Sequence, residues 1–397
     1  MHLSNRQLFQ QNLAIPADVP DALEIEKAEG IYLFTDKGEK YIDLVSGVSV
    51  SNIGHRHPAV VKAVKSQSDK YMHLMVYGKY IQSPQVQLAG LLSSVLPVYL
   101  NSVFLVNSGS EAIEGALKLA KRITGRTEII AFKDSYHGST HGALSILGNE
   151  EMKSAYRPLL PNIKFLEYNN PEQLSHITNE TACVVAEAIQ AEAGIIIPSN
   201  EFMKALNKRC KETGCMIIID EVQMGFGRTG KLFGFEHFNI APDIICIAKG
   251  MGGGMPIGAF ISSKENMNLL THNPALGHIT TFGGHPVSSA AALANLNVIL
   301  EEDLHSKSNN KGKYIADKLK SHPKIKEIRQ IGLMLGVELK EDFQASKMVK
   351  ILKKNRLIVD QFLFNESSFR IAPPLIISEN ELEIVVEKVI ESLDELK

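Results

Sequence analysis

The sequence predicts an α/β fold: a large domain with a mostly parallel sheet between helices, and a smaller α+β domain built from the chain ends. Between about residues 100 and 300, short and continuously apolar runs alternate with segments of helical periodicity. Runs without polar alternation are typical of strands covered on both faces, as in a parallel sheet between helices. The length of 397 residues exceeds what one core of ordinary size needs, so a second domain is expected.

The strands of the predicted sheet are the apolar runs themselves. They are residues 103–106, 128–132, 163–166, 183–186, 216–219 and 243–248. A helix is expected after the first run, because apolar residues recur at helical spacing from Ile113 to Ile123 and Gly125 then ends the pattern. Another helix, at 202–213, is expected between two later strands.

The two ends of the chain have a different pattern. Residues 24–43 alternate in polarity and are interrupted at 36–38, as in a β-hairpin. A long helix is expected from about residue 286, and residues 332–339 and 369–372 are expected to be strands of the smaller domain.

The last helix is expected to begin at Ser378, which has capping-box spacing to Glu381. The chain is therefore predicted to divide into three parts. They are an N-terminal segment of the small domain at 1–45, a large cofactor-binding domain at 46–285, and a linking helix with the C-terminal small domain at 286–397.

The composition excludes several classes of protein. Lys and Arg number 42 against 44 Asp and Glu, and no Lys/Arg-rich run suggests a partner such as nucleic acid or an anionic membrane. No apolar stretch reaches the ~18 residues of a membrane span. The N-terminus is polar where a signal peptide would be apolar, and the four cysteines lack a common zinc spacing. We therefore expect a cytoplasmic protein with no metal, nucleic-acid or membrane partner.

Polar residues gather directly after five of the expected strands. They are residues 107–111 and 134–138, Glu187, Asp220 and Lys249. The carboxyl ends of parallel strands meet at one edge of a sheet, where ligands bind. We therefore expect one binding site built from all five segments.

The segment at 107–111 suggests a phosphate-binding site. Ser108 and Glu111 have the spacing of a capping box, which predicts the start of a helix. Gly109 would let a ligand approach the backbone, and the free N–H groups and dipole of a helix start favour an anion by about 0.3–2 kcal/mol. A plain helix cap has the same pattern, so this segment alone does not establish a phosphate-binding site.

Lys249 and Asp220 together point to a cofactor. A lysine at a strand end with a lowered pKa can attack a carbonyl group. A carboxylate at the end of a neighbouring buried strand needs a positive partner, and the protonated pyridine nitrogen of pyridoxal 5'-phosphate is one. With the phosphate-binding segment, the pair predicts a pyridoxal-phosphate enzyme in which the charged ring stabilises a carbanion.

Two nucleotide-binding motifs fit less well. The glycine-rich segment at 250–258 fails the G-x-G-x-x-G spacing, because Met255 stands in place of the third glycine. Residues 225–231 nearly match the phosphate-binding loop of NTPases, but Leu232 stands where Ser or Thr should hold magnesium. The possible magnesium strand at 217–221 also runs directly into this loop, whereas the two motifs normally come from separate strands.

The chain resembles the class III (subgroup II) aminotransferases, and most of all the acetylornithine and ornithine aminotransferase branch. The resemblance runs from about Tyr32 to the C-terminal helix. Its blocks are residues 107–112, 136–138, 192–194, 220–223, 225–230, 248–250, 252–256, 281–284 and 370–374. Together they are specific to the superfamily and much less specific to a substrate. They imply the type I aminotransferase fold and an obligate homodimer with shared active sites.

The resemblance implies five residues around the cofactor ring. Lys249 would hold the cofactor as a Schiff base and shuttle the proton of the substrate carbon. Asp220 would pair with the pyridine nitrogen, and Gln223 would bond the ring 3-oxygen. Val222 and Tyr136 would lie on the two faces of the ring.

The resemblance also implies five residues around the phosphate and the substrate. Gly109 and Ser110 would bind the phosphate, helped by Thr281 from a second subunit. Arg370 would bind a substrate carboxylate, with Glu192 as its switchable counter-ion.

The activity implied is transamination through pyridoxamine phosphate. The amino group would come from an amino acid or ω-amino donor similar to acetylornithine or ornithine, and an oxo acid such as 2-oxoglutarate would accept it. Alternatives of the same fold are an enzyme that uses another amine donor with pyruvate, and one that isomerises or decarboxylates an amino acid. A non-catalytic pyridoxal-phosphate protein is disfavoured, because the lysine and the aspartate are both present.

One block departs from the acetylornithine and ornithine branch. There an arginine follows the Tyr-His-Gly block and clamps the substrate α-carboxylate, but here Ser139 follows it. Val48 likewise replaces a tyrosine that helps hold the α-amino group. Serine cannot make a bidentate, charge-assisted contact, which is worth about 1.5–3 kcal/mol. The sequence predicts a donor with a differently placed carboxylate, or none, unless an arginine such as Arg56 or Arg157 substitutes.

Overall fold

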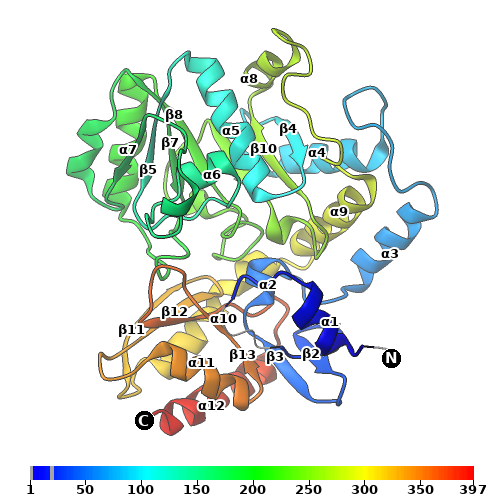
Figure 1. Ribbon diagram of the computed structural model, residues 1–397, viewed down its shortest axis with the longest axis vertical. Helices are drawn as coiled ribbons and strands as arrows, with labels where there is room; N and C mark the ends of the chain where they lie inside the picture. The colour runs from blue at the N-terminus through cyan, green and yellow to red at the C-terminus, as the bar shows by residue number, and fades with distance from the viewer. Residues whose placement is uncertain (1–2, 18–21) are drawn as a thin grey trace.

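The computed structural model describes residues 3–17 and 22–397, which form three β-sheets (Figure 1). The largest has the strand order β4-β10-β9-β8-β7-β5-β6. Its strands are β4 (Ser102–Val106), β5 (Glu128–Phe132), β6 (Ile163–Leu166), β7 (Thr181–Glu187), β8 (Met216–Asp220), β9 (Ile244–Ile247) and β10 (Gly258–Ser262). Only β10 runs antiparallel to its neighbours, β4 and β9. The predicted mostly parallel sheet is confirmed, and β10 is a strand that the sequence analysis missed.

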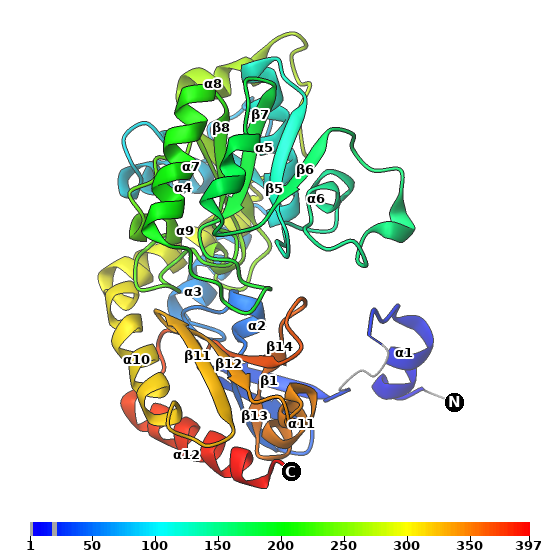
Figure 2. The ribbon, with the colours of Figure 1, turned by 90° about the vertical axis from the view of Figure 1, so that its left-hand side faces the viewer.

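Helices lie on both faces of this sheet, as the two ribbon views show (Figures 1 and 2). Successive residues of a strand point to opposite faces. In β8, Ile217 and Ile219 pack in one hydrophobic cluster with α7 (Asn200–Thr213), whereas Ile218 packs in another with α5 (Gly109–Thr124). Each side chain of the strand therefore meets a helix, which explains why the run is continuously apolar.

Seven further α-helices precede α10 (Leu304–Leu319) in the part of the chain that the structure describes. They are α1 (Asn5–Asn12), α2 (Ser46–Ser49), α3 (Pro58–Ser68), α4 (Ser83–Val95), α6 (His141–Ser145), α8 (Lys264–Asn268) and α9 (Pro286–Glu301). Helix α1 has no buried residue, and Figure 2 shows it apart from the main body of the chain. The long helix expected from about residue 286 is α9.

The chain ends form two four-stranded sheets in the lower half of Figure 1. One contains β1 (Ile25–Glu29), β2 (Tyr32–Thr35), β3 (Lys40–Asp43) and β13 (Leu357–Ile358). The other contains β11 (Ile325–Ile331), β12 (Met334–Leu339), β15 (Ser368–Ile371) and β14 (Asp360–Gln361). The parallel pair β3–β13 joins the two ends of the chain.

Three helices accompany these sheets: α10 (Leu304–Leu319), α11 (Ala345–Lys354) and α12 (Glu379–Glu395). The predicted hairpin is β2–β3, and the predicted capping box at Ser378 and Glu381 starts α12. The polar strand β11 was not anticipated. The division at residues 45 and 285 stays a prediction, and residues 1–2 and 18–21 of its first segment lie outside the described residues.

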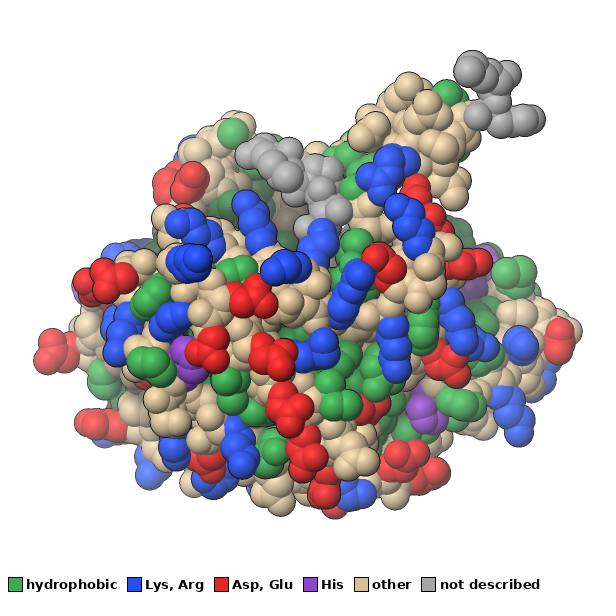
Figure 3. All heavy atoms as spheres, turned by 90° about the horizontal axis from the view of Figure 1, so that it is seen from below, with side chains coloured by type: hydrophobic (Ala, Val, Ile, Leu, Met, Phe, Trp, Pro, Cys, Tyr) green, Lys and Arg blue, Asp and Glu red, His purple; other side chains and the backbone are tan. Residues whose placement is uncertain are grey.

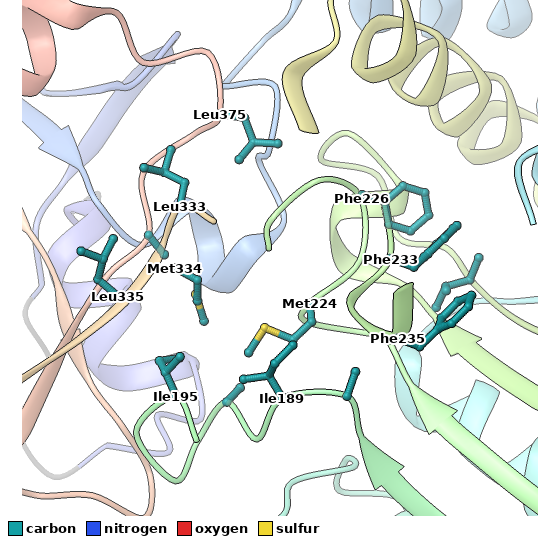
Figure 4. Packing of buried hydrophobic residues seen from close by; sticks show 14 of the residues in the cluster. Ile189, Ile195, Met224, Phe226, Phe233, Phe235, Leu333, Met334, Leu335 and Leu375 are labelled. Carbon is teal, nitrogen blue, oxygen red and sulfur yellow. The ribbon is translucent and has the colours of Figure 1, made fainter. Parts of the chain in front are cut away.

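A hydrophobic cluster joins the large sheet to the chain ends. Figure 4 shows Ile189, Ile195 and Met224, from the loops after β7 and β8, facing Met334 and Leu335 of β12. The loops at the carboxyl ends of the large sheet are thus packed against the strands next to β15.

The buried Arg228 reinforces this junction. Its guanidinium donates to the carbonyls of Leu333 (3.1 Å) and Pro373 (2.6 Å) and to Oδ1 of Asn52 (2.6 Å). Burial lowers the pKa of Arg228 to about 9. Because Pro373 follows β15 closely, this side chain ties the loop after β8 to the strand that carries Arg370.

The described surface gives a mixed charge pattern on its lower face. Figure 3 shows Lys/Arg and Asp/Glu side chains intermingled there. Over residues 3–17 and 22–397, no helix combines the length and apolar character that a bilayer span requires. The four cysteines are unpaired and buried.

Candidate active site

A cavity of about 430 Å³ lies at the carboxyl edge of the large sheet. The structure brings together in its lining the five polar segments that the sequence singled out: residues 107–110, residues 136–138, Glu187, Asp220 and Lys249. Val50, Glu192, Val222, Gln223, Met224 and residues 254–257 complete most of the wall. The parallel order of the strands explains the convergence, because each of these segments leaves the same edge.

One end of the cavity is the start of α5. Ser108 caps this helix, since its Oγ accepts a hydrogen bond from the backbone of Glu111 (3.2 Å). The carboxylate of Glu111 does not return to Ser108 as in a full capping box; it accepts from the backbone (2.7 Å) and side-chain amide (2.9 Å) of Asn107. The first N–H groups of a helix have no carbonyl partner within it, so this end can bind an anion.

Two glycines of the lining allow close approach between segments. A Cβ at Gly109 would lie 2.7 Å from Cγ1 of Val222, and one at Gly138, where φ is +125°, would lie 2.1 Å from Oγ of Ser110. Any other residue at these positions would push apart the helix start and the loops after β5 and β8. The lining is therefore narrow where a ring and a phosphate are expected.

Lys249 presents an unpaired amine to the cavity. It follows β9 with φ of +46°, and its side chain is half-buried. No hydrogen bond or ion pair joins its Nζ to any residue that the structure describes. Burial lowers the pKa of the Lys249 ammonium, while the nearby Glu192, Asp220 and Glu187 oppose that shift. An amine in this state can act as a nucleophile and as a proton acceptor.

Asp220 is held in a fixed orientation at the end of β8. Its Oδ2 lies 2.7 Å from Nδ1 of His137, and its Oδ1 accepts from the backbone of Val222 (2.9 Å). The side chain is 5% exposed, and Nε2 of His137 is buried without a partner among the described residues. His137 belongs to the polar segment at 134–138, and its one signal in the sequence was this position at the carboxyl end of β5. The structure shows that it orients the carboxylate of Asp220.

Glu187 is a second buried carboxylate of the lining. Its two oxygens accept from the backbone of Tyr136 (3.0 Å) and of Ala191 (2.8 Å). Burial raises the pKa of Glu187 to about 7. These contacts fix the main chain at Tyr136, so Glu187 positions a residue expected beside the cofactor ring.

Arg370 lies behind the lining in a closed network and is 1% exposed. Its Nη2 contacts both carboxylate oxygens of Glu192, each at 2.9 Å. The side chain of Gln223 bridges this pair: its Oε1 accepts from Nη1 of Arg370 and its Nε2 donates to Glu192, both at 3.0 Å. The predicted partners Arg370 and Glu192 therefore meet, and Gln223, expected at the cofactor ring, is engaged with both of them.

Thr281 does not line the cavity of its own chain. It is exposed, and its hydroxyl lies 3.2 Å from that of Tyr77. Within one chain, the phosphate end of the cavity is therefore built from residues 107–110 without this threonine.

The residues considered for a substrate carboxylate are dispersed. Ser139 is exposed, and its Oγ lies 3.1 Å from the hydroxyl of Tyr136. Arg56 is exposed and its ion pair is with Glu29, and Arg157 is exposed and paired with Glu150. Neither arginine lines the cavity of its own chain, and whether one of them replaces an arginine at Ser139 stays a prediction.

Comparisons with known proteins match nearly the whole chain. The family model "Aminotransferase class-III" matches residues 15–393. An acetylornithine aminotransferase of Methanopyrus kandleri is 39% identical, with 92% of each chain covered. A [LysW]-aminoadipate semialdehyde/glutamate semialdehyde transaminase of Sulfolobus acidocaldarius is 38% identical, with 85% of this chain and 86% of the relative covered. The crystal structure of a transaminase from the marine bacterium Virgibacillus superposes with a TM-score of 0.89 at 29% identity, covering 100% of this chain and 96% of the other.

Proposed function

The chain belongs to the class-III aminotransferases, and from this premise we propose that it moves amino groups with pyridoxal 5'-phosphate held in the cavity described above. It is an aminotransferase of the type I fold, as the sequence predicted. Its reaction class is therefore amino-group transfer between an amino donor and an oxo acid. The observation that carries the proposed cofactor is the unpaired amine of Lys249 in the same cavity as the buried carboxylate of Asp220.

The lining offers a candidate residue for each part of the cofactor. Lys249 would hold it covalently, Asp220 would pair with the ring nitrogen, and Val222 and Tyr136 would flank the ring. Gly109 and Ser110, at the start of a 16-residue helix, would bind the phosphate. Gln223 would reach the ring 3-oxygen. When bound, the group supplies an electron sink that stabilises a carbanion.

The residues of this chain would supply the proton chemistry and the orientation. Lys249 would take the proton from the substrate carbon and return it, a task that its lowered pKa favours. His137 and the backbone N–H of Val222 hold the carboxylate of Asp220 in one orientation, and this carboxylate is buried. Arg370 would bind the carboxylate of the oxo acid once Glu192 has moved off it.

The charges of the lining bear on the donor. Glu187, Glu192 and Asp220 are acids, and Lys249 is the one lysine or arginine in the described lining. A donor carboxylate would therefore find no free cation there while Glu192 pairs with Arg370. We propose a donor whose carboxylate is absent or placed differently from that of acetylornithine. The alternatives are acetylornithine itself, as the relatives' names suggest, another amine donor used with pyruvate, and an aminomutase reaction, which would need no separate acceptor.

Acetylornithine is therefore expected to be a poor donor. We expect kcat/KM below about 10⁴ M⁻¹s⁻¹, an ordinary value for an enzyme and its substrate. Diamines should convert the cofactor to its amino form faster, because they carry no carboxylate and need no cation. Simple ω-amino acids, whose carboxylate is placed differently from that of acetylornithine, are the second group of donors to compare. The measurement is the absorbance change of the purified holoenzyme with each donor, followed by turnover with 2-oxoglutarate.

Ser139→Arg is the matched variant for this test. A restored bidentate contact should raise kcat/KM for acetylornithine about tenfold or more and leave a diamine unaffected. Efficient use of acetylornithine by the unaltered enzyme, with no gain from Ser139→Arg, would contradict the proposed donor class.

We also propose a homodimer with shared active sites. Apolar side chains are exposed on two neighbouring segments that the Tyr77–Thr281 contact joins. They include Ile81 at 94% and Phe282 at 54%, together with Met72, Met75, Tyr80, Leu276 and Ile279. Several large apolar side chains exposed on neighbouring segments are typical of an interface. The cytoplasmic location stays a prediction.

Mixed dimers should report whether Thr281 serves a second subunit. A Lys249→Ala chain combined with a Thr281→Ala chain has one site with an intact lysine and an intact threonine from the other chain. About one working site per mixed dimer is therefore expected, whereas Lys249→Ala dimers are inactive. Specific activity after subunit exchange is the measurement. No recovery, with exchange verified by mass, would count against the shared site.

A further inference from the structure

Arg370 has a second acidic neighbour besides Glu192. Asp360 of β14 pairs with Arg370 of β15 in the antiparallel register, and its Oδ1 lies 3.3 Å from Nε of the arginine. Both atoms are buried, and the contact is an ion pair that is not aligned as a hydrogen bond. The ring of Phe362 lies 4.8 Å from the guanidinium. Arg370 is thus enclosed by two carboxylates, an amide and an aromatic ring.

The two acids stand on different sides of the guanidinium. Glu192 occupies Nη2, lines the cavity, and sits in the loop after β7. Asp360 faces Nε, does not line the cavity, and is anchored in a strand pair with β15. A substrate carboxylate that enters from the cavity meets the Nη atoms, so it must displace Glu192. Asp360 lies outside this path, because it does not line the cavity.

Asp360 retains its charge near neutral pH. Burial raises its pKa to about 6, and Arg370 opposes that rise, while Glu192 and Asp43 add to it. A carboxylate bound at Arg370 would then share one cation with Asp360, and the displaced Glu192 would remain in the same region. Like charges that share one cation repel each other, and solvent moderates this repulsion because the side chain of Asp360 is 36% exposed.

We propose that Asp360 is a specificity-determining residue, a fixed second counter-ion that weakens the hold of Arg370 on the carboxylate of the oxo acid. The proposal rests on the function proposed above for Arg370. Asp360 makes release of the carboxylate easier and sets the affinity of the acceptor site independently of the donor. Glu192 determines whether the guanidinium of Arg370 is available, and Asp360 determines how tightly the available guanidinium binds the substrate carboxylate.

The test uses glutarate, a dicarboxylate that has neither an amino nor an oxo group. Calorimetric titration of the holoenzyme near neutral pH should give a Kd about three- to tenfold lower for Asp360→Asn than for the unaltered enzyme. KM for 2-oxoglutarate should fall in parallel, while the rate of the half-reaction with the amino donor stays unchanged. Asp360→Ser, which shortens the side chain, should give the same direction.

Glu366→Gln is the matched control, because Glu366 is an exposed acid between β14 and β15. It should leave the Kd of glutarate unchanged. Arg370→Lys tests the proposed role of Arg370 separately from the proposed role of Asp360. If Arg370→Lys weakens glutarate binding but Asp360→Asn and Asp360→Ser bind it no more tightly than the unaltered enzyme, the role of Asp360 is wrong and that of Arg370 stands. If Arg370→Lys has no effect on the Kd, the proposed role of Arg370 fails and the inference falls with it.

Discussion

Lys249→Ala is expected to fold and to lose both the covalent link to the cofactor and nearly all turnover. The amine of Lys249 is unpaired in the cavity, so its removal breaks no hydrogen bond or ion pair among the described residues. Turnover should fall about 10⁴-fold or more, because a positioned proton acceptor alone contributes about 10²–10⁴-fold and the covalent attachment is lost as well. The measurements are borohydride reduction followed by peptide mapping, and kcat with the best amino donor.

Lys231→Ala is the matched control. Lys231 is an exposed lysine at the end of the segment 225–231, which resembles a phosphate-binding loop of NTPases, and it does not line the cavity. Its variant should keep the covalent link and the turnover. If reduction of the Lys249→Ala protein still fixes the cofactor on another lysine, the assignment of Lys249 is wrong.

Asp220→Ala is expected to retain part of the cofactor and to turn over about 10²–10⁴-fold more slowly. Without this carboxylate, the proton on the ring nitrogen loses its partner and the electron sink weakens, and each ~1.4 kcal/mol of added barrier costs a factor of ten. His137 also loses the partner of its Nδ1. Cofactor content should be measured from absorbance and turnover per bound cofactor from kinetics, so that weaker binding is not mistaken for slower chemistry.

Asp243→Ala separates this effect from the general cost of removing a carboxylate that accepts a backbone hydrogen bond. Asp243 accepts a hydrogen bond from the backbone of Ile217 (2.7 Å), at the opposite edge of the same sheet. Its loss should lower the melting temperature and leave turnover per folded enzyme unchanged. Near-normal turnover of Asp220→Ala would remove the reason for assigning the ring nitrogen to this residue.

Local patterns in the sequence were enough to predict most of the large sheet. The run at 216–219 is apolar at every position because α5 and α7 cover its two faces. Burial on both faces can therefore be recognised from the amino-acid composition of the run. The placement of Asp220 and Lys249 at one edge followed from the parallel arrangement, since strands of one direction end together. The caps of α5 and α12 were predictable because a cap involves residues three positions apart.

The direction of β10 could not be read from its residues. Residues 258–262 are as apolar as a parallel strand, and the choice of direction depends on the route of the connecting chain. The sequence also gave no reason to couple His137 with Asp220, because these residues are 83 positions apart and become neighbours only when β5 and β8 take their places in the sheet.

Local patterns were therefore enough to predict the fold class, the family resemblance and the candidate reactive residues. Tertiary structure alone decided how Arg370 is enclosed by Glu192, Gln223 and Asp360, and that Arg56 and Arg157 lie away from the cavity. The physical reason is that helix periodicity, strand burial and caps are local properties of the chain. The charge around a buried arginine is instead the sum of side chains from separate strands and loops, which have no common pattern in the sequence.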